Sequence, residues 1–137
     1  MSTALERLGQ RRNALYERLQ ALGDFRPGTI SVNFRKCGKK RCVCARPAHP
    51  GHGPQYLWNT TRGGHSRAQN LRLGPELEKA RREVENHQVF LRLCRELVEV
   101  NENICRLRPA VQVQDEKELE ALKKKLQKQF LGRRRRR

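Results

Sequence analysis

The sequence predicts an α+β protein in which long helices form an antiparallel hairpin or coiled coil beside a small three-stranded antiparallel sheet. Three observations lead to this fold class. Leucines recur every three or four positions near the N-terminus, and apolar residues do so again after residue 75, which is typical of helices that pack together. Between these stretches lie three short segments rich in β-forming residues. A turn with three cysteines follows the first segment and predicts a zinc-binding turn on the sheet.

Two helices are expected to form the hairpin. Over residues 3–22 the leucines follow alternating spacings of three and four, and Thr3 with Glu6 has the spacing of a capping box. Residues 76–107 carry two neighbouring apolar lines, so this longer helix has a face wide enough for two partners. One expected partner is the first helix, folded back antiparallel. The other is the same helix in a second subunit of a homodimer.

The two apolar lines of the long helix run side by side. One line consists of Leu77, Ala80, Val84, His87, Leu91, Cys94, Val98, Asn101 and Cys105. The other consists of Phe90, Leu93, Leu97, Val100, Ile104 and Leu107. We expect Cys94 and Cys105 to be small core residues. We expect Asn101 to be a polar residue that sets the register of the helices, and not a catalytic one.

Three strands are predicted at residues 29–36, 55–61 and 66–73. The first alternates apolar and polar residues, and the other two are rich in β-formers or alternate again. A Gly63-Gly64 turn separates the last two, because glycine supplies the positive φ angles of a tight hairpin. A sheet this small needs a staple or a covering helix. The cysteine turn and the helices would supply both.

The cysteine turn has the ligands that a structural zinc site requires. Its spacing is C-x4-C-x-C-x4-H-x2-H, from Cys37 through Cys42 and Cys44 to His49 and His52. Three thiolates and one imidazole would complete a tetrahedron around one structural Zn²⁺, and the spacing leaves both histidines as candidates. The alternatives are a set of small buried or redox-active thiols, or a disulfide framework. A disulfide framework is disfavoured because cysteines on a tight turn pair poorly and no secretory signal is visible.

The C-terminal part predicts a separate basic segment. Pro109 ends the long helix, and a further helix is expected over residues 116–131 with Gly132 as its stop. The arginines from Arg133 to Arg137 would then form a flexible phosphate-binding arm, with a cloning artefact or a localisation signal as alternatives. The expected organisation is a domain over residues 1–108, followed by a linker, basic helix and arginine tail over residues 109–137.

The net charge is +17, and much of it is concentrated around the sheet. Residues 31–73 contain nine Lys and Arg and no acid, and no carboxylate occurs between Asp24 and Glu76. A surface with one sign of charge repels itself unless a polyanion neutralises it, and nucleic acid is the natural polyanion. The expected nucleic-acid-binding residues are Arg35, Lys36, Lys39, Lys40, Arg41, Arg46, Arg62, Arg67, Arg72, Lys123, Lys124, Lys125, Lys128, Arg133, Arg134, Arg135, Arg136 and Arg137.

The cysteine turn and its neighbours resemble a known sequence pattern. Cys37-Gly38, Cys42-x-Cys44 and His52-Gly53-Pro54, followed by the Gly63-Gly64 hairpin and a long helix, resemble an uncharacterised family of small bacterial proteins met in transposase and mobile-element neighbourhoods. The resemblance covers roughly residues 3–108. It implies that His52 is the fourth ligand and that the context is the DNA of a mobile element, but it supplies no function to transfer. The apolar seams of the helices suggest docking to a partner such as a transposase, or dimerisation. Gln55 departs from the pattern, which often has an aromatic residue after Pro54.

These observations favour a nucleic-acid-binding accessory protein over an enzyme. A metal-dependent nuclease needs carboxylates near the phosphate, and residues 25–75 have none. An adaptor for RNA or a ribonucleoprotein is the alternative, although DNA is favoured. Phe34, Tyr56 and Trp58 would either stack on unpaired bases or form the sheet core. Because no recognition helix is apparent, we expect weak sequence preference. Apolar runs are too short to cross a bilayer, so the cytoplasm, associated with the nucleoid, is the expected location.

Overall fold

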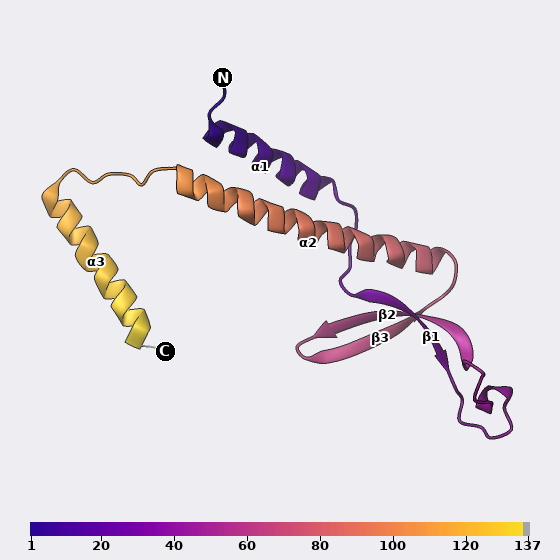
Figure 1. The fold of residues 1–137 in the computed structure, drawn as a ribbon. Helices are drawn as coiled ribbons and strands as arrows, with labels where there is room; N and C mark the ends of the chain where they lie inside the picture. The colour runs from indigo at the N-terminus through magenta and orange to yellow at the C-terminus, as the bar shows by residue number, and fades with distance from the viewer. Residues whose placement is uncertain (136–137) are drawn as a thin grey trace. The chain divides into compact units, whose positions relative to one another are not determined.

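The computed structural model describes residues 1–135 and contains three helices and one three-stranded sheet within them (Figure 1). The elements in chain order are α1 (Ala4–Ala21), β1 (Thr29–Arg35), a short 3₁₀ turn η1 (Val43–Ala45), β2 (His52–Arg62), β3 (His65–Leu71), α2 (Pro75–Leu107) and α3 (Glu116–Arg135). The chain forms two compact units, Met1–Ile104 and Cys105–Arg137. The mixed α+β class is therefore confirmed.

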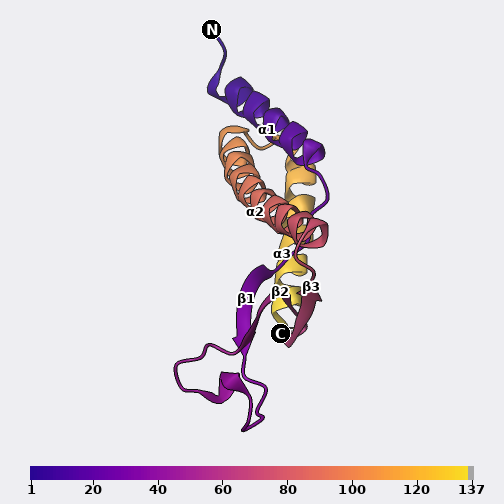
Figure 2. The same ribbon diagram turned by 90° about the vertical axis from the view of Figure 1, so that its right-hand side faces the viewer.

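Helices α1 and α2 share the main hydrophobic core. Thr3 and Glu6 form the predicted capping box at the start of α1. Leu15 of α1 is buried with residues of α2, and the cluster comprises Leu15, Leu93, Val100 and Ile104, with Leu5, Leu8, Leu19, Leu22, Val89 and Leu97 packed against it. Arg12 contacts Asn101, and Asp24, just after α1, contacts Asn86. The two helices therefore run in opposite directions along each other (Figure 2); their supercoiling as a coiled coil stays a prediction.

Only one of the two apolar lines predicted on α2 is covered along the C-terminal half of the helix. Leu93, Val100 and Ile104 are buried, whereas Leu91 and Val98 on the other line are 43% and 62% exposed. The single helix α1 covers one stripe of α2, so the second stripe remains at the surface. Cys105 is exposed, which corrects its prediction as a core residue, while Cys94 is partly buried.

The sheet has the strand order β1-β2-β3, and both pairs are antiparallel. Strand β2 begins at His52, three residues earlier than predicted, because Arg35 of β1 pairs with His52 beyond a one-residue irregularity in the register. Gly63 and Gly64 form the predicted β2–β3 turn, with φ angles of 54° and 79°. Strand β3 ends at Leu71, so Arg72 and Leu73 lie beyond it in the turn before Pro75.

Arg26 joins the sheet to α2. Its guanidinium forms an ion pair with Glu83 at 2.7 Å and lies over the ring of Trp58, 4.6 Å from the ring centroid. The indole N–H of Trp58 donates a hydrogen bond to the Pro27 carbonyl at 2.7 Å. Leu71 is buried, as are Ala80 and Val84 in the first turns of α2. The sheet is thus held by specific polar contacts and a few buried side chains.

The C-terminal helix extends further than predicted. Asp115 accepts a hydrogen bond from the Lys117 amide at 3.0 Å and caps α3, which continues through Gly132 to Arg135. The prediction that Gly132 stops the helix is wrong, because one glycine costs only about 1 kcal/mol in a helix and the following arginines are good helix formers. Arg136 and Arg137 lie outside the described residues. Over residues 1–135, none of the helices is long and apolar enough to traverse a bilayer.

Candidate metal centre

The segment between β1 and β2 folds into a turn that brings cysteines together. Gly38 adopts a φ of 80°, which glycine tolerates without strain. The amide of Cys42 then donates to the Lys39 carbonyl at 3.2 Å, and the amide of Ala45 donates to the Cys42 carbonyl at 3.0 Å. These short-range bonds close a turn followed by η1, so that Cys42 and Cys44 approach Cys37.

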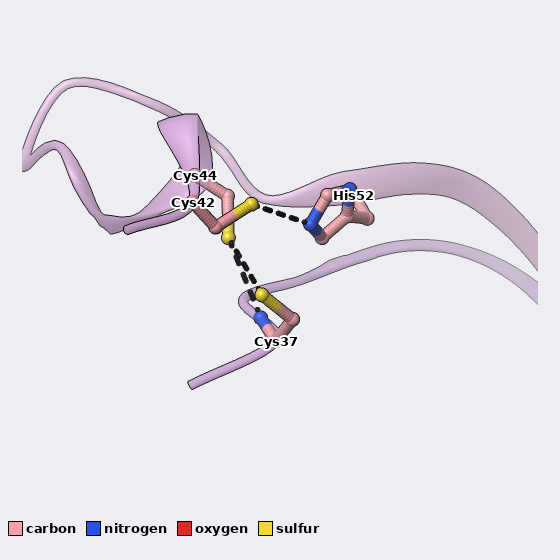
Figure 3. A group of neighbouring side chains, drawn as sticks. All are labelled: Cys37, Cys42, Cys44 and His52. Carbon is pink, nitrogen blue, oxygen red and sulfur yellow. Dashed lines mark hydrogen bonds between the residues drawn. The ribbon is translucent and has the colours of Figure 1, made fainter. Parts of the chain in front are cut away.

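Four side chains converge in this turn, as Figure 3 shows. Cys37, Cys42, Cys44 and His52 each offer one ligand atom, and these atoms all lie within 4.8 Å of one another. The Cys37 and Cys44 sulfurs are 3.5 Å apart, and the Cys42 sulfur is 3.2 Å from Nε2 of His52. The edges of a tetrahedral zinc–thiolate site are about 3.8 Å long, from Zn–S bonds of about 2.3 Å. The cluster therefore has the size of a four-ligand metal site.

This geometry distinguishes between the two candidate histidines. His52 is the first residue of β2 and contributes its Nε2 to the cluster. His49 is outside it, and its Nδ1 accepts a hydrogen bond from the Gly51 amide at 3.0 Å. His49 therefore supports the turn, and His52 is the residue placed to complete the ligand set.

Gly51 fixes the entry into β2. It is buried and has a φ of 110°, and a Cβ atom built on it would lie 2.7 Å from the backbone carbonyl carbon of Arg35. No side chain fits between these two backbone segments. The close approach places His52 opposite the end of β1, within reach of the cysteines.

Hydrogen bonds favour the thiolate form of the first cysteine. The backbone amide of Lys39, followed by the side chains of His52 and Cys44, lowers the pKa of Cys37 to about 6. The Cys37 backbone amide also lowers the pKa of Cys44, but burial and the neighbouring thiols outweigh it, and the pKa of Cys44 is raised. Cys44 is 1% exposed, so its charged form is stabilised chiefly when a cation neutralises it.

The basic residues predicted to bind nucleic acid lie at the surface wherever their side chains are described. The turn positions Lys39, Lys40, Arg41 and Arg46 are all exposed. Lys36 donates to the Arg46 carbonyl at 3.2 Å, which holds one side of the turn. Arg35, Arg62, Arg67, Arg72, Lys123, Lys124, Lys125, Lys128 and Arg133 are exposed as well. For Arg134 and Arg135 only the helical backbone is described.

The aromatic residues differ in their availability for stacking. Trp58 is partly buried under Arg26, and Tyr56 is also partly buried. Phe34 is 48% exposed beside the cysteine turn. Neither the sheet-core nor the base-stacking interpretation therefore applies to all three residues.

Two features of this region were not predicted. The link from Arg26 to Trp58 and Glu83 joins residues far apart in the chain, and no local pattern indicates it. The position of Gly51 has a partial local signal, because Pro50-Gly51 indicates a turn, but its close approach to Arg35 is seen only in the structure.

Residues 5–82 match the model of a family described as a domain of unknown function (DUF6788). The match includes α1, the sheet with its cysteine turn and the start of α2. No curated protein matches the chain, and no solved structure does.

Proposed function

The chain belongs to the DUF6788 family, since the match covers more than half of its length, and we propose that it is a nucleic-acid-binding accessory protein whose metal turn presents basic residues to the DNA backbone. The observation that carries this proposal is the position of the Cys37–His52 cluster inside an acid-free basic segment. Residues 31–73 contain nine Lys and Arg and no carboxylate. Such a segment attracts polyanions of any sequence.

The metal in this proposal is one structural zinc ion. Three thiolates and an imidazole are soft and borderline donors that suit Zn²⁺ better than Mg²⁺ or Ca²⁺, which prefer oxygen. Four protein ligands fill a tetrahedron and leave no open position for a substrate, as in structural rather than catalytic sites. Bound zinc would also neutralise the thiolates and fix the turn.

The fixed turn would bind phosphate through three neighbouring side chains. Lys39, Lys40 and Arg41 are exposed between the first two ligands, Cys37 and Cys42. A metal-held turn keeps these charges at set distances, so their binding does not cost the ordering of a flexible loop. Arg133–Arg135 would add charge from the last turn of helix α3, and not from the flexible arm expected from the sequence.

The wider role that we propose is association with a transposase or other mobile-element machinery, in the cytoplasm and on the nucleoid. The likeness of the Cys37–Pro54 pattern to proteins of mobile-element neighbourhoods supports this context. The exposed second stripe of α2, with Leu91 and Val98, offers a surface for a protein partner or a second copy of the chain.

The test is a salt titration of purified, zinc-loaded protein with fluorescently labelled duplex DNA. If roughly six to ten phosphates are neutralised, affinity should fall about 10³- to 10⁵-fold between 50 and 200 mM salt. The same titration with duplex RNA separates the alternative, because tighter binding to RNA would favour an RNA-binding adaptor. Absence of binding to either would reject the nucleic-acid proposal.

A further inference from the structure

One face of the sheet carries mostly polar, uncharged side chains, with Leu57 at its centre. In an antiparallel sheet directly paired residues share a face, and alternate residues point to opposite faces. The pairs Ser31–Leu57, Asn33–Gln55 and Leu57–Asn70 therefore place hydroxyl and amide side chains on one face. We define the amide face by its polar residues around Leu57, which are Ser31, Asn33, Gln55, Asn59, Thr61 and Asn70.

The other face has a different chemistry. It contains Ile30 and Val32 of β1, paired with Trp58 and Tyr56, and the buried Leu71. Trp58 on that face receives the Arg26 guanidinium that also binds Glu83 of α2. The sheet thus turns its apolar face toward the helix contacts and its amide face away from them.

The amide face is accessible and partly hollowed. Asn33, Gln55, Thr61 and Asn70 are exposed. An open groove of about 560 Å³ runs over one end of the sheet, lined in part by Asn59, Thr61 and Ser66. Within it the Asn59 amide nitrogen donates to the Ser31 hydroxyl at 2.8 Å, which fixes how the Asn59 amide is presented.

From this arrangement we propose that the amide face reads base edges in the major groove of duplex DNA, a proposal that rests on the nucleic-acid-binding function above. Asn and Gln can form two hydrogen bonds to adenine, and Ser and Thr can bond to several bases. The major groove of B-DNA, about 12 Å wide, admits a two-stranded β-ribbon, and strands lie about 4.8 Å apart. Strand β1 pairs with β2 only as far as the Thr29–Asn59 pair, so the β2–β3 hairpin is two strands wide from Thr60 to the Gly63-Gly64 tip that would enter the groove first.

Charge around the amide face supports this occupant. Arg35 and Lys36 lie at the end of β1, Arg62 at the hairpin turn, and Arg67 beside the groove. By register Arg62 and Arg67 belong to the opposite face, so these four cations lie at the ends of the sheet beside the amide face and not on it. Their long side chains could reach phosphates that flank the bases opposite the amide face. Duplex RNA fits less well, because the major groove of A-form RNA is deep and narrow. This proposal departs from the expectation of weak sequence preference, which depended on the lack of a recognition helix.

The experiment selects binding sites from a random duplex DNA library with zinc-loaded protein, then measures affinity for the selected and a scrambled duplex. The variant Asn70→Ala should lower affinity for the selected duplex by roughly 5- to 150-fold, the value of one good bidentate base contact, and change affinity for the scrambled duplex less than about twofold. The matched control Gln69→Ala removes the neighbouring amide from the opposite face and should leave both affinities unchanged. Circular dichroism and zinc content establish that both variants are folded.

A second arm tests the groove. Replacing adenine N7 by carbon (7-deazaadenine) in the selected duplex removes a major-groove acceptor, and it should weaken the wild type but not the Asn70→Ala variant if Asn70 contacts that base. If the selection enriches no sequence although the protein still binds DNA, the proposal that the amide face reads bases is overturned. The backbone-binding function would then remain. Loss of all DNA binding would instead reject the proposed function itself. A selected site that is bound only as single strand or RNA would also overturn the major-groove assignment.

Discussion

Arg12 of α1 donates a hydrogen bond to the side-chain oxygen of Asn101 in α2, with 3.2 Å between Nη1 and Oδ1. The bond crosses an otherwise leucine-rich helix interface, and Asn101 also donates to the Leu97 carbonyl at 2.9 Å. A polar pair within an apolar interface favours one register of the two helices over slipped alternatives.

The replacement Asn101→Leu should therefore destabilise the protein, because it removes the acceptor of a partly buried guanidinium. We expect a loss of about 1–3 kcal/mol in the free energy of unfolding. The double variant Arg12→Leu/Asn101→Leu should recover much of this loss, since both polar groups are gone. Urea denaturation of the four proteins in a double-mutant cycle measures the coupling. Strict additivity of the two single changes would show that the hydrogen bond does not contribute.

Substitutions at the four candidate ligands should affect zinc retention much more than substitution of the nearby His49. We expect about one zinc per chain by elemental analysis, and Cys37→Ser, Cys42→Ser and His52→Ala should each lower zinc retention because metal binding and local folding are coupled. His49→Ala is the control, since His49 only accepts a bond from the Gly51 amide. It should retain zinc nearly as well as the wild type. Weaker zinc retention in His49→Ala than in His52→Ala would move the fourth ligand.

Zinc retention should depend on pH in a defined direction. The pKa of Cys37 is lowered to about 6, so this thiol is mostly thiolate at pH 7 without a metal and about half protonated near pH 6. Because protons compete with zinc for the thiolates and the pKa of Cys44 is raised, affinity should already decrease from pH 8 to 7. It should decrease more steeply below about pH 6, where Cys37 is protonated as well. A competition titration with a chromophoric chelator at each pH measures this. Affinity that is unchanged at pH 5 would argue against a thiolate–imidazole ligand set.

The two basic regions should contribute separately to the salt dependence of DNA binding. Deleting residues 133–137 should decrease the slope of log affinity against log salt by several units, at about 0.9 for each phosphate that the protein no longer neutralises. Replacing Lys39, Lys40 and Arg41 with alanine should decrease it further and should also weaken any preference for a DNA shape. Titrations at four salt concentrations give the slopes. Equal slopes in wild type and both variants would place the phosphate-binding residues elsewhere.

The ion pair between Arg26 and Glu83 should stabilise the junction of sheet and helix in a pH-dependent way. Lys79 and then Arg26 lower the pKa of Glu83, whose side chain is 13% exposed. A carboxyl with a lowered pKa contributes stability above its unfolded pKa of about 4.3 and loses it as the pH falls through the folded value. Glu83→Gln should therefore cost about 1–3 kcal/mol at pH 7 and much less at pH 3. Glu85→Gln, at an exposed position of the same helix, is the matched control.

The sequence predicted best those parts of the fold that depend on neighbouring residues. The hairpin turn at Gly63-Gly64, the capping box at Thr3 and the end of α2 each follow from residues a few positions apart. The cysteine cluster belongs to the same class, because Cys37, Cys42 and Cys44 lie within one turn. Local chemistry was sufficient in these cases.

Features set by distant contacts could not be predicted in the same way. Which stripe of α2 is buried depends on where α1 lies, and this decided that Val100 is buried and Val98 exposed. The register irregularity that pairs Arg35 with His52 depends on the close approach of Gly51. Helix α3 continues through Gly132 because one glycine destabilises a helix only slightly, so glycine by itself does not predict where a helix ends.

The pairing of Arg35 with His52 has a consequence for the order in which the metal site assembles. Antiparallel pairing of β1 with β2 holds both ends of the cysteine turn together. Strand pairing therefore already offsets most of the entropic cost of closing this loop. When a metal ion binds, only the segment between Arg35 and His52 then has to become ordered. Metal capture would follow sheet formation, and a chain stripped of its ion would refill quickly without first having to unfold.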